Sequence, residues 1–428
     1  MRLRKKWFYW LPLLAVLALV AAACNGEADP DAPGEVSVMS AFTGDEADLF
    51  RESIAAFEEE TGIDVDYEPA DGFETVIQTR VEGGNPPDIA MFPQPGLLMD
   101  IVEQTDAAPL SEFMDIDELE DTMAQGFLDA TRDEDGEAYG LPMRLANKSL
   151  LWYPVPQFEE AGYSIPETQE EMIELEEQIR ADGHVPWCLG MESGDATGWV
   201  GTDWVEEYML RLHDAEVYDA WVEGEQPFDS PEVREAFEWF GRVWQEEGNV
   251  VGGTDGLINI PFGESPNVMF DDEPGCYLHR QGNFVTGFFP PDVQEDLDAH
   301  VGVAFFPPFE GEDSPILAGG DLALMINDTE EARAFMEYMA QPQFGEEWAA
   351  EGGWLSPNVD FDPSVYPDEV HRQMHQTAVD ADVIRFDASD MMPGAVGTGS
   401  FWSGIVDWVG GRRDLDEVLE FIDGTWPN

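Results

Sequence analysis

Basic residues are scarce in this chain. Its 428 residues include 19 Lys or Arg against 91 Asp or Glu, which gives a formal net charge of −72, and Lys148 is the only lysine after residue 6. Nucleic acids and anionic membrane surfaces are bound through basic patches, so both are disfavoured as partners. Repulsion among so many carboxylates is tolerable chiefly where salt screens it. We therefore expect a protein adapted to a saline habitat.

Long apolar runs are absent beyond the N-terminus, although 43% hydrophobic residues and 14 tryptophans exclude a disordered chain. The one long run, Trp7–Ala23, follows the basic start of residues 1–6 and ends in small residues before Cys24. This pattern predicts a cleaved export signal over residues 1–23. A transmembrane helix is the weaker interpretation, because Pro12 interrupts a run shorter than the ~20 residues that a bilayer requires.

The residues directly before Cys24 resemble the lipobox of bacterial lipoproteins, in which the cysteine carries the lipid. We expect Cys24 to be lipidated and residues 24–34 to form a flexible, lipid-anchored stalk. Lipoboxes more often have Leu where this chain has Ala21, so secretion by the ordinary A-x-A route stays open. Without the signal the net charge would be −76, because the signal carries four basic residues and no acid.

Cysteine is also scarce. Besides Cys24 the chain has only Cys188 and Cys276, each close to Pro or Gly. In an exported protein, two such cysteines predict one disulfide. Two free buried thiols are the alternative.

Catalytic motifs are absent: the chain has no G-x-S-x-G, no H-E-x-x-H and no P-loop. His371 and His375 are four residues apart, but no third histidine is near, so we interpret them as part of a solvated helix rather than as metal ligands. The glycine-rich segment 394–399 follows no predicted strand, which disfavours a dinucleotide site. We expect no enzyme activity, no metal and no cofactor. A glycoside hydrolase with an acidic pair is the alternative, because 91 acids would hide such a pair.

Strand and helix patterns alternate from the start of the part that follows the predicted signal. Strand patterns at 36–39, 63–67 and 89–92 enclose helix patterns at 45–60 and 73–81. This order is typical of a parallel sheet covered by helices, so the predicted fold class is α/β. Later helix patterns, with capping residues at their starts, lie at 168–179, 230–244, 328–339 and 414–423; we expect Asp328 and Glu331 to cap the third.

Five segments along the chain carry a resemblance to a known family. They are Gly84–Ile89, Lys148–Tyr153, Pro186–Cys188 running on to Thr202–Trp204, Gly319–Ala323, and Met392–Pro393 through Phe401–Trp402. By these segments the chain resembles the extracellular solute-binding proteins of sugar ABC importers, most of all the α-glucoside-binding branch and more distantly the maltose-binding proteins.

The resemblance implies a two-lobed periplasmic-binding-protein fold with hinge strands and a cleft between the lobes. The first lobe would comprise residues 35–145 plus 323–355, and the second residues 146–322 plus 356–428. It also implies a monomer, on the extracellular face of the membrane or in the periplasm, that captures a sugar by hinge closure and delivers it to the ABC permease. The membrane would be touched only through the lipid.

A sugar presents C–H faces that aromatic rings can cover, and hydroxyls that carboxylates, amides and cations can bind. The resemblance places a stacking aromatic at Trp402. The expected ligand-binding residues are Trp402, Phe401, Asp321, Gly320, Trp199, Asp203, Trp204, Phe92, Gln94, Asp45, Asn147, Lys148 and Trp354.

Each of these residue types also has a structural interpretation. Tryptophans are often core residues, and we assign Trp239 and Trp244, which lie on a helical apolar stripe, to packing. Asp203 and Asp321 could instead belong to turns or caps. Lys148 could form a salt bridge to one of the many acids.

Overall fold

The computed structural model describes residues 34–124, 127–133, 135–311, 315–379 and 383–427. The predicted signal, Cys24 and the predicted stalk except Gly34 lie outside these residues. Among the described residues, no helix is long and apolar enough to cross a membrane.

The larger sheet has the strand order β2-β1-β3-β8-β4, with β9 pairing to β8. Its parallel part, β1 with β2 and β3, is the one that the alternating patterns predict. The pattern did not predict β8, which runs antiparallel to both β3 and β4. The strands are β1 (Glu35–Ser40), β2 (Asp64–Pro69), β3 (Ile89–Phe92), β4 (Gly140–Asn147), β8 (Ile316–Met325) and β9 (Ile384–Phe386).

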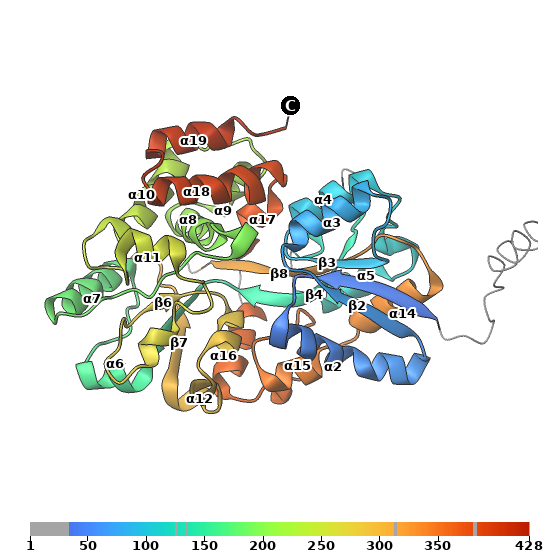
Figure 1. Ribbon diagram of the computed structural model, residues 1–428, viewed down its shortest axis with the longest axis horizontal. Coiled ribbons are helices and arrows are strands. Elements are labelled where there is room, and N and C mark those ends of the chain that lie inside the picture. Colours follow the sequence, from blue (N-terminus) through green and yellow to red (C-terminus); the bar gives the residue numbers. More distant parts are fainter. Residues whose placement is uncertain (1–33, 125–126, 134, 312–314, 380–382, 428) are drawn as a thin grey trace, which may run out of the picture.

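Helices cover this sheet and form the first lobe with it (Figure 1). Their apolar faces pack on the buried strands, with Phe50, Phe57 and Ile77 fully or almost fully buried. The helices are α2 (Gly44–Thr61), α3 (Phe73–Glu82), α4 (Pro95–Gln104), η1 (Leu110–Glu112), α5 (Ile116–Thr122), η2 (Asp129–Thr131), α14 (Glu330–Met339) and α15 (Glu346–Glu351).

The second lobe is mostly helical and holds the small antiparallel sheet β6-β5-β7. Its strands are β5 (Leu150–Pro154), β6 (His279–Arg280) and β7 (Val301–Phe305). The helices before β6 are α6 (Val155–Ala161), α7 (Gln169–Ala181), η3 (Gly194–Ala196), α8 (Trp199–Leu212), α9 (Ala215–Val222), α10 (Pro231–Gln245), α11 (Gly253–Asn259) and η4 (Asn267–Phe270). Those after it are η5 (Asn283–Phe288), α12 (Pro291–Gln294), α13 (Leu297–His300), η6 (Pro363–Val365), α16 (Glu369–Val379), α17 (Ala388–Met391), η7 (Ala395–Phe401), α18 (Trp402–Val409) and α19 (Leu415–Asp423).

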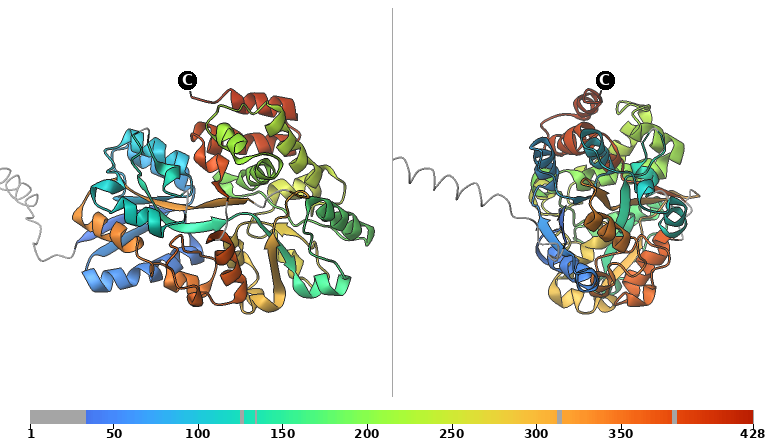
Figure 2. Two further views of the ribbon diagram at one scale, coloured as in Figure 1. Left: turned by 180° about the vertical axis from the view of Figure 1, so that it is seen from behind. Right: turned by 90° about the vertical axis from the view of Figure 1, so that its right-hand side faces the viewer.

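Strands β4 and β8 connect the two lobes, as the view from behind shows (Figure 2). Their ladder runs from the pair Gly140 and Leu324 to the pair Asn147 and Ala318. At its far end β4 passes through Lys148 and Ser149 into β5 of the second lobe, while the start of β8 pairs with β9. The ladder is therefore the structural hinge. The residue boundaries that we give to the lobes stay a prediction.

Most predicted helix ends are observed, with one correction. Thr168 and Ser230 accept the expected backbone hydrogen bonds at the starts of α7 and α10, and α19 has a complete capping box. The prediction for α14 was wrong by one residue: Thr329 caps the helix by accepting from the Ala332 amide. Asp328 pairs with Arg333 instead, because a short acidic side chain in front of the cap lies beside the arginine of the first turn.

The predicted disulfide is present between Cys188 and Cys276, whose Cα atoms are 5.5 Å apart. Both cysteines are fully buried. The bridge closes a sequence separation of 88 residues within the second lobe.

The excess of carboxylates leads to a prediction about stability. With 91 acids and 19 basic residues, most surface carboxylates have no cation to pair with. Raising KCl from about 0.1 M to about 2 M shortens the Debye length from ~10 Å to below 3 Å and should raise the unfolding midpoint. Thermal melts of the mature protein at the two salt concentrations test this, and a lower midpoint in high salt would contradict the halophilic interpretation.

Candidate functional site

Polar side chains gather at the carboxyl edge of the parallel strands of the first lobe. Ser40 ends β1 and Phe92 ends β3, and the segments that follow supply Glu46 and Gln94. Gln94 is 4% exposed and donates its amide to Glu74 at 3.2 Å. Its side-chain oxygen is buried and has no partner among the described residues. An unpaired buried acceptor is costly, so this oxygen is suited to a donor brought by a ligand.

Arg144 of β4 lies beside this edge. Its Nε donates to Asp321 at 2.7 Å and its Nη1 to Glu46 at 2.7 Å. The guanidinium lies over the rings of Phe42 and Trp348, with centroid distances of 4.6 and 5.3 Å.

Gly320 permits the close approach of the strands beside this arginine. It has φ of +151°, and a Cβ there would lie 2.0 Å from the carbonyl oxygen of Arg144. Gly320 and Asp321, both predicted site residues, therefore shape and orient the arginine. The role of Arg144 itself was missed, because no sequence pattern singled it out.

An aromatic cluster of Trp199, Phe262 and Phe284 lies in the second lobe at the start of α8. Trp199, the first residue of α8, is half-buried and contacts Phe262 and Phe284 at ring distances of 5.1 and 6.0 Å. Both phenylalanines are also half-buried, and they were missed although each is near a glycine. Half-exposed rings of this kind can cover the C–H face of a sugar.

Trp402 lies next to this aromatic cluster, which we call the aromatic platform. A Cβ at Gly198 would be 2.4 Å from the Trp402 carbonyl oxygen, so the start of α8 packs directly on that backbone. Trp402 is 4% exposed, and its Nε1 donates to the Ser389 hydroxyl at 3.2 Å.

Two of the predicted aromatic residues pack in the core of the second lobe. Phe401 is fully buried against Trp221 and Phe228, at ring distances of 5.7 and 5.1 Å. Trp204 is fully buried between Trp187 and Phe306, among other rings. These side chains present no surface to a solute, so we correct their assignment to packing.

Lys148 follows the hinge strand β4 and is enclosed by carboxylates. Its Nζ lies 2.5 Å from Asp387, 3.2 Å from Asp203 and 3.6 Å from Asp390. An ammonium group has three donors, and here they face these acids rather than open solvent. Burial raises the pKa of Asp203 well above its ordinary value, although Lys148 opposes the shift. Burial would also raise the pKa of Asp387, but Lys148 and neighbouring hydrogen bonds lower it.

The acids around Lys148 include the one described group with metal-like spacing. Carboxyl oxygens of Asp203, Glu206 and Asp387 all lie within 4.8 Å of one another. The Lys148 ammonium already pairs with two of the three, and the backbone amides of Ala388 and Ser389 donate to Glu206. A cation would compete with a resident positive charge, so this donor set does not favour a metal.

The other predicted site residues lie around the same region or in the packing beside it. Phe92 is buried against Phe73, and Trp354 is buried against Phe344 and Phe361. Asn147 is buried and accepts from the Ser149 amide. Asp45 is exposed at the start of α2, one residue before the Glu46 that contacts Arg144.

The histidine pair was described wrongly from the sequence. His371 and His375 lie on α16 but are 1% and 4% exposed, so this helix face is not solvated. His371 Nδ1 donates to Asp368 at 2.9 Å, and its Nε2 accepts from the Gly353 amide. The pattern missed this because α16 packs against both α13 and β7. Residues 395–399 of the glycine-rich segment lie in η7, a π-helix that follows α17, and Gly394 precedes it.

The two lobes touch where α4 meets α17 (Figure 1). A Cβ at Gly96 would lie 2.1 Å from the carbonyl oxygen of Met392, and Asp100 accepts from the Gly394 amide at 3.2 Å. Burial raises the pKa of this Asp100 carboxyl. The contact lies beside the candidate site, because Gln94 immediately precedes α4 and Asp390 is in α17.

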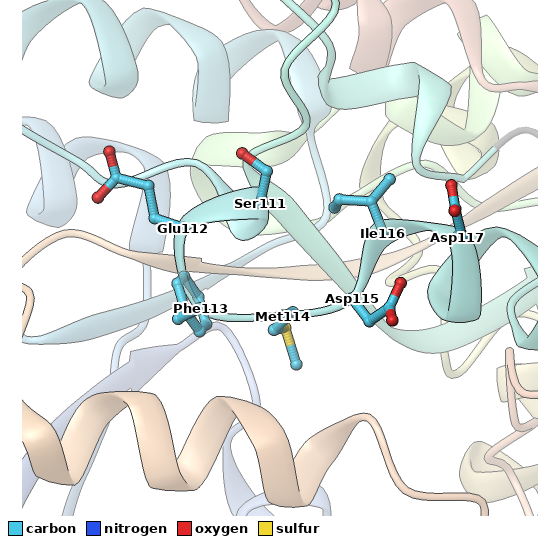
Figure 3. Close-up of a pocket in the computed structure, with 7 residues that line it drawn as sticks. All are labelled: Ser111, Glu112, Phe113, Met114, Asp115, Ile116 and Asp117. Carbon is cyan, nitrogen blue, oxygen red and sulfur yellow. The ribbon is translucent and has the colours of Figure 1, made fainter.

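Two hollows are lined by other residues. A groove of about 660 Å³ on the first lobe is lined by one stretch of chain, residues 111–117 (Figure 3). A cavity of about 330 Å³ is lined by parts of η5, α12 and α13 and by the segment around Gly352 and His371. Neither includes a residue that the sequence predicted to bind ligand.

The sequence matches one family model and is similar to known binding proteins. A sequence model of the family described as "Bacterial extracellular solute-binding protein" matches residues 43–256. The chain is 43% identical over 424 residues to the osmoprotective compounds-binding protein GgtB of Synechocystis sp., covering 98% of this chain and 99% of that protein. It is 37% identical over 401 residues to the alpha-glucosides-binding periplasmic protein AglE of Rhizobium meliloti, covering 91% and 86%.

Solved structures show the same fold. A chitin oligosaccharide binding protein matches with a TM-score of 0.76 at 15% identity, over 92% of this chain and 98% of that one. The binding protein RafE in complex with raffinose matches with a TM-score of 0.68 at 17% identity, over 91% and 98%. The two-lobed α/β fold predicted from the sequence is thereby confirmed.

Proposed function

The chain belongs to the family of bacterial extracellular solute-binding proteins, and from that premise we propose that its solute is an α-glucoside or a similar small oligosaccharide. As a member of this family it is the solute-binding component of an ABC importer and not an enzyme, which sets aside the glycoside hydrolase alternative. The class of solute within the family is our proposal.

The observation that carries the proposal is the pairing of an aromatic platform with polar groups from the opposite lobe. Trp199 offers a half-exposed ring, while Gln94 offers a buried acceptor without a partner. A sugar offers a partner to each of them, because its C–H face stacks on indole and its hydroxyls donate to an amide oxygen.

The names of the relatives narrow the class further. One is named for osmoprotective compounds and the other for alpha-glucosides. The acidic composition of this chain disfavours an anionic solute, because like charges repel. We therefore propose a neutral α-linked disaccharide as the first candidate.

The remaining parts of the proposal concern the place of the protein in the cell. We propose that Cys24 is lipidated and holds a monomer at the extracellular face of the membrane, with the permease subunits as partner. Metabolic labelling with a radioactive fatty acid tests the anchor: label should enter the wild type and be lost in Cys24→Ala.

A screen of sugars tests the solute class. Trehalose, sucrose, maltose, raffinose and glucose are titrated calorimetrically into the mature protein in high salt, with glycine betaine as a zwitterionic osmolyte for comparison. A bound ligand at ~100 times its Kd adds about 2.7 kcal/mol of stability, so a thermal shift should accompany binding. Chromatography of the recovered sugar should show no turnover. Binding of glycine betaine alone would overturn the proposed class.

Replacing Trp199 by alanine should weaken binding of the sugar found in that screen. Loss of a stacking ring costs ~1–3 kcal/mol, or about 5- to 150-fold in Kd. Trp402→Ala should have a smaller direct effect, because this ring is almost fully buried. Titration and a denaturant melt on each variant separate binding from folding, with Trp239→Ala as the packing control. Unchanged affinity in folded Trp199→Ala would remove the platform from the site.

A further inference from the structure

Lys148 is the only lysine among the described residues, and it lies where the hinge strand β4 enters the second lobe. Its side chain is 8% exposed and crosses Gly319 of β8, where a Cβ would approach Lys148 Cε to 2.8 Å. Because residue 319 is a glycine, there is room for the aliphatic part of the Lys148 side chain. Burying a lysine costs folding free energy. This cost indicates that Lys148 has a role that the other basic residues of the chain do not fulfil.

One set of contacts leads from Lys148 to Trp402. Lys148 pairs with Asp387, which caps α17 by accepting from the Asp390 amide at 3.0 Å. The Ser389 hydroxyl donates to Asp387 at 2.8 Å and accepts from Trp402 Nε1 at 3.2 Å. The indole of Trp402 is thus held to the hinge through two hydrogen bonds and one ion pair.

A second set leads to Trp199. Lys148 pairs with Asp203, which lies on the same helix as Trp199, one turn further along. The Nζ itself lies 5.4 Å from the centroid of the Trp199 ring. A cation at this distance from an indole face is attracted to it and fixes its orientation.

We propose that Lys148 is a positioning residue that sets both tryptophans of the solute site relative to the hinge. It does so by anchoring α17 through Asp387 and the start of α8 through Asp203, and it touches no solute itself. This inference rests on the proposed function only in naming the site that the two tryptophans serve.

The charges of Lys148 and of the carboxyl groups around it favour a single, fixed arrangement of these side chains. Asp203 and Asp390 have pKa values raised by burial, whereas that of Asp387 is lowered by Lys148 despite its burial. Asp387 is therefore the carboxylate that keeps its charge for the lysine. Removing the ammonium leaves Asp387 with hydrogen bonds but no cation, which favours a rearrangement of α17.

The test uses the mature protein with its tryptophan indoles labelled with nitrogen-15, and it first needs no solute. Trp199→Phe and Trp402→Phe assign the two indole N–H signals. Lys148→Met should move both signals. If this variant does not fold, Lys148→Met/Asp387→Asn removes the ion pair with Asp387 without leaving a charge on residue 387, and both signals should again move. Ser389→Ala should move the Trp402 signal. In a second sample with carbon-13-labelled lysine, this variant should leave the signal of Lys148, the only lysine of the mature protein, in place.

Arg211→Met is the matched control. Arg211 is a fully buried cation of the same lobe that pairs with Glu207 and donates to the Phe306 carbonyl at 2.7 Å. Its ion pairs reach Asp203 only through Glu207 and Arg280, and none of them joins Arg211 directly to Lys148 or Asp387. This variant should lose stability and keep both indole signals. If Trp199 and Trp402 keep their wild-type signals in a folded Lys148 variant, the lysine has only a stabilising role and the proposal is overturned.

The second readout is affinity for whichever sugar binds best in the screen above. Kd should rise about tenfold or more in the folded Lys148 variants and stay unchanged in Arg211→Met. Unchanged Kd in the Lys148 variants would also overturn the proposal. If no sugar binds the wild type, the proposed function fails, while the indole signals still decide the role of Lys148.

Discussion

Gly96→Ala should lower affinity for the solute by at least about 100-fold without lowering the stability of the ligand-free protein. In the described contact between the lobes, a methyl group at this position would lie 2.1 Å from the carbonyl oxygen of Met392 and 2.8 Å from that of Met391. No side-chain rotation relieves a clash between a Cβ and backbone, so α4 and α17 cannot meet in this geometry. If solute binding requires the closed contact, the variant binds with one lobe only.

In solute-free protein whose lobes are apart, where this contact is not made, the effect on stability should have the opposite sign. Gly96 is near the start of α4 and has no left-handed φ, so alanine fits the helix and improves its propensity by up to ~1 kcal/mol. Calorimetric titration and a denaturant melt of the free protein measure the two quantities on one sample. Gly287→Ala is the control, because a Cβ at Gly287 meets nothing within 4 Å. Equal affinities of Gly96→Ala and wild type would mean that the lobes hold the solute without this contact.

Cys188→Ala/Cys276→Ala should destabilise the protein by roughly 2–5 kcal/mol. A bridge that closes 88 residues removes much conformational freedom from the unfolded chain, and the gain grows with loop length. Both sulfur atoms are also buried, so their loss adds a small packing cost. Denaturant melts of oxidised wild type and of the double variant measure the difference.

Reduction of the wild type provides the independent check on this value. Wild type unfolded with a reductant present should match the double variant to within the packing cost of two thiols. If the double variant is as stable as the oxidised wild type, the bridge constrains a region that stays ordered in the unfolded chain.

The sequence predicted the local pattern of the first lobe better than its sheet. Alternation of helix and strand from Glu35 to Phe92 is a local property, so β1, β2 and β3 could be placed along the chain before their pairing was known. Strand β8 could not be placed, because all ten of its residues are buried and show no alternation. Its partners β3 and β4 are also far away in sequence.

Neighbouring aromatic residues of the predicted site show where sequence reasoning fails. Phe401 and Trp402 are adjacent, but they lie where η7 meets α18 and point about 100° apart around the helix axis. One enters the core of the second lobe and the other reaches Ser389. Trp199 and Trp204 separate in the same way along α8, with Trp204 enclosed by rings from other helices. Which face of a helix is covered depends on partners that the pattern of one segment does not contain.

The polar residues were harder still. Glu46, Glu74 and Asp390 are three acids among 91, and nothing in their neighbourhood marks them. Lys148 was noticeable only because lysine is so rare, and the rarity gave no indication that its ammonium would be enclosed by Asp203, Asp387 and Asp390.

The shared hinge ladder also determines how the protein loses its structure. Strand β8 pairs with β3 at one end and with β9 at the other, and a single apolar cluster joins Val38 and Leu324 of the large sheet to Trp152 and Phe289 beyond the hinge. Unfolding one lobe alone would break the pairing of β8 and expose the part of the apolar cluster that lies in the other lobe. Although the second lobe also has an apolar cluster of its own, we therefore expect the two lobes to unfold as one cooperative unit with a single calorimetric transition.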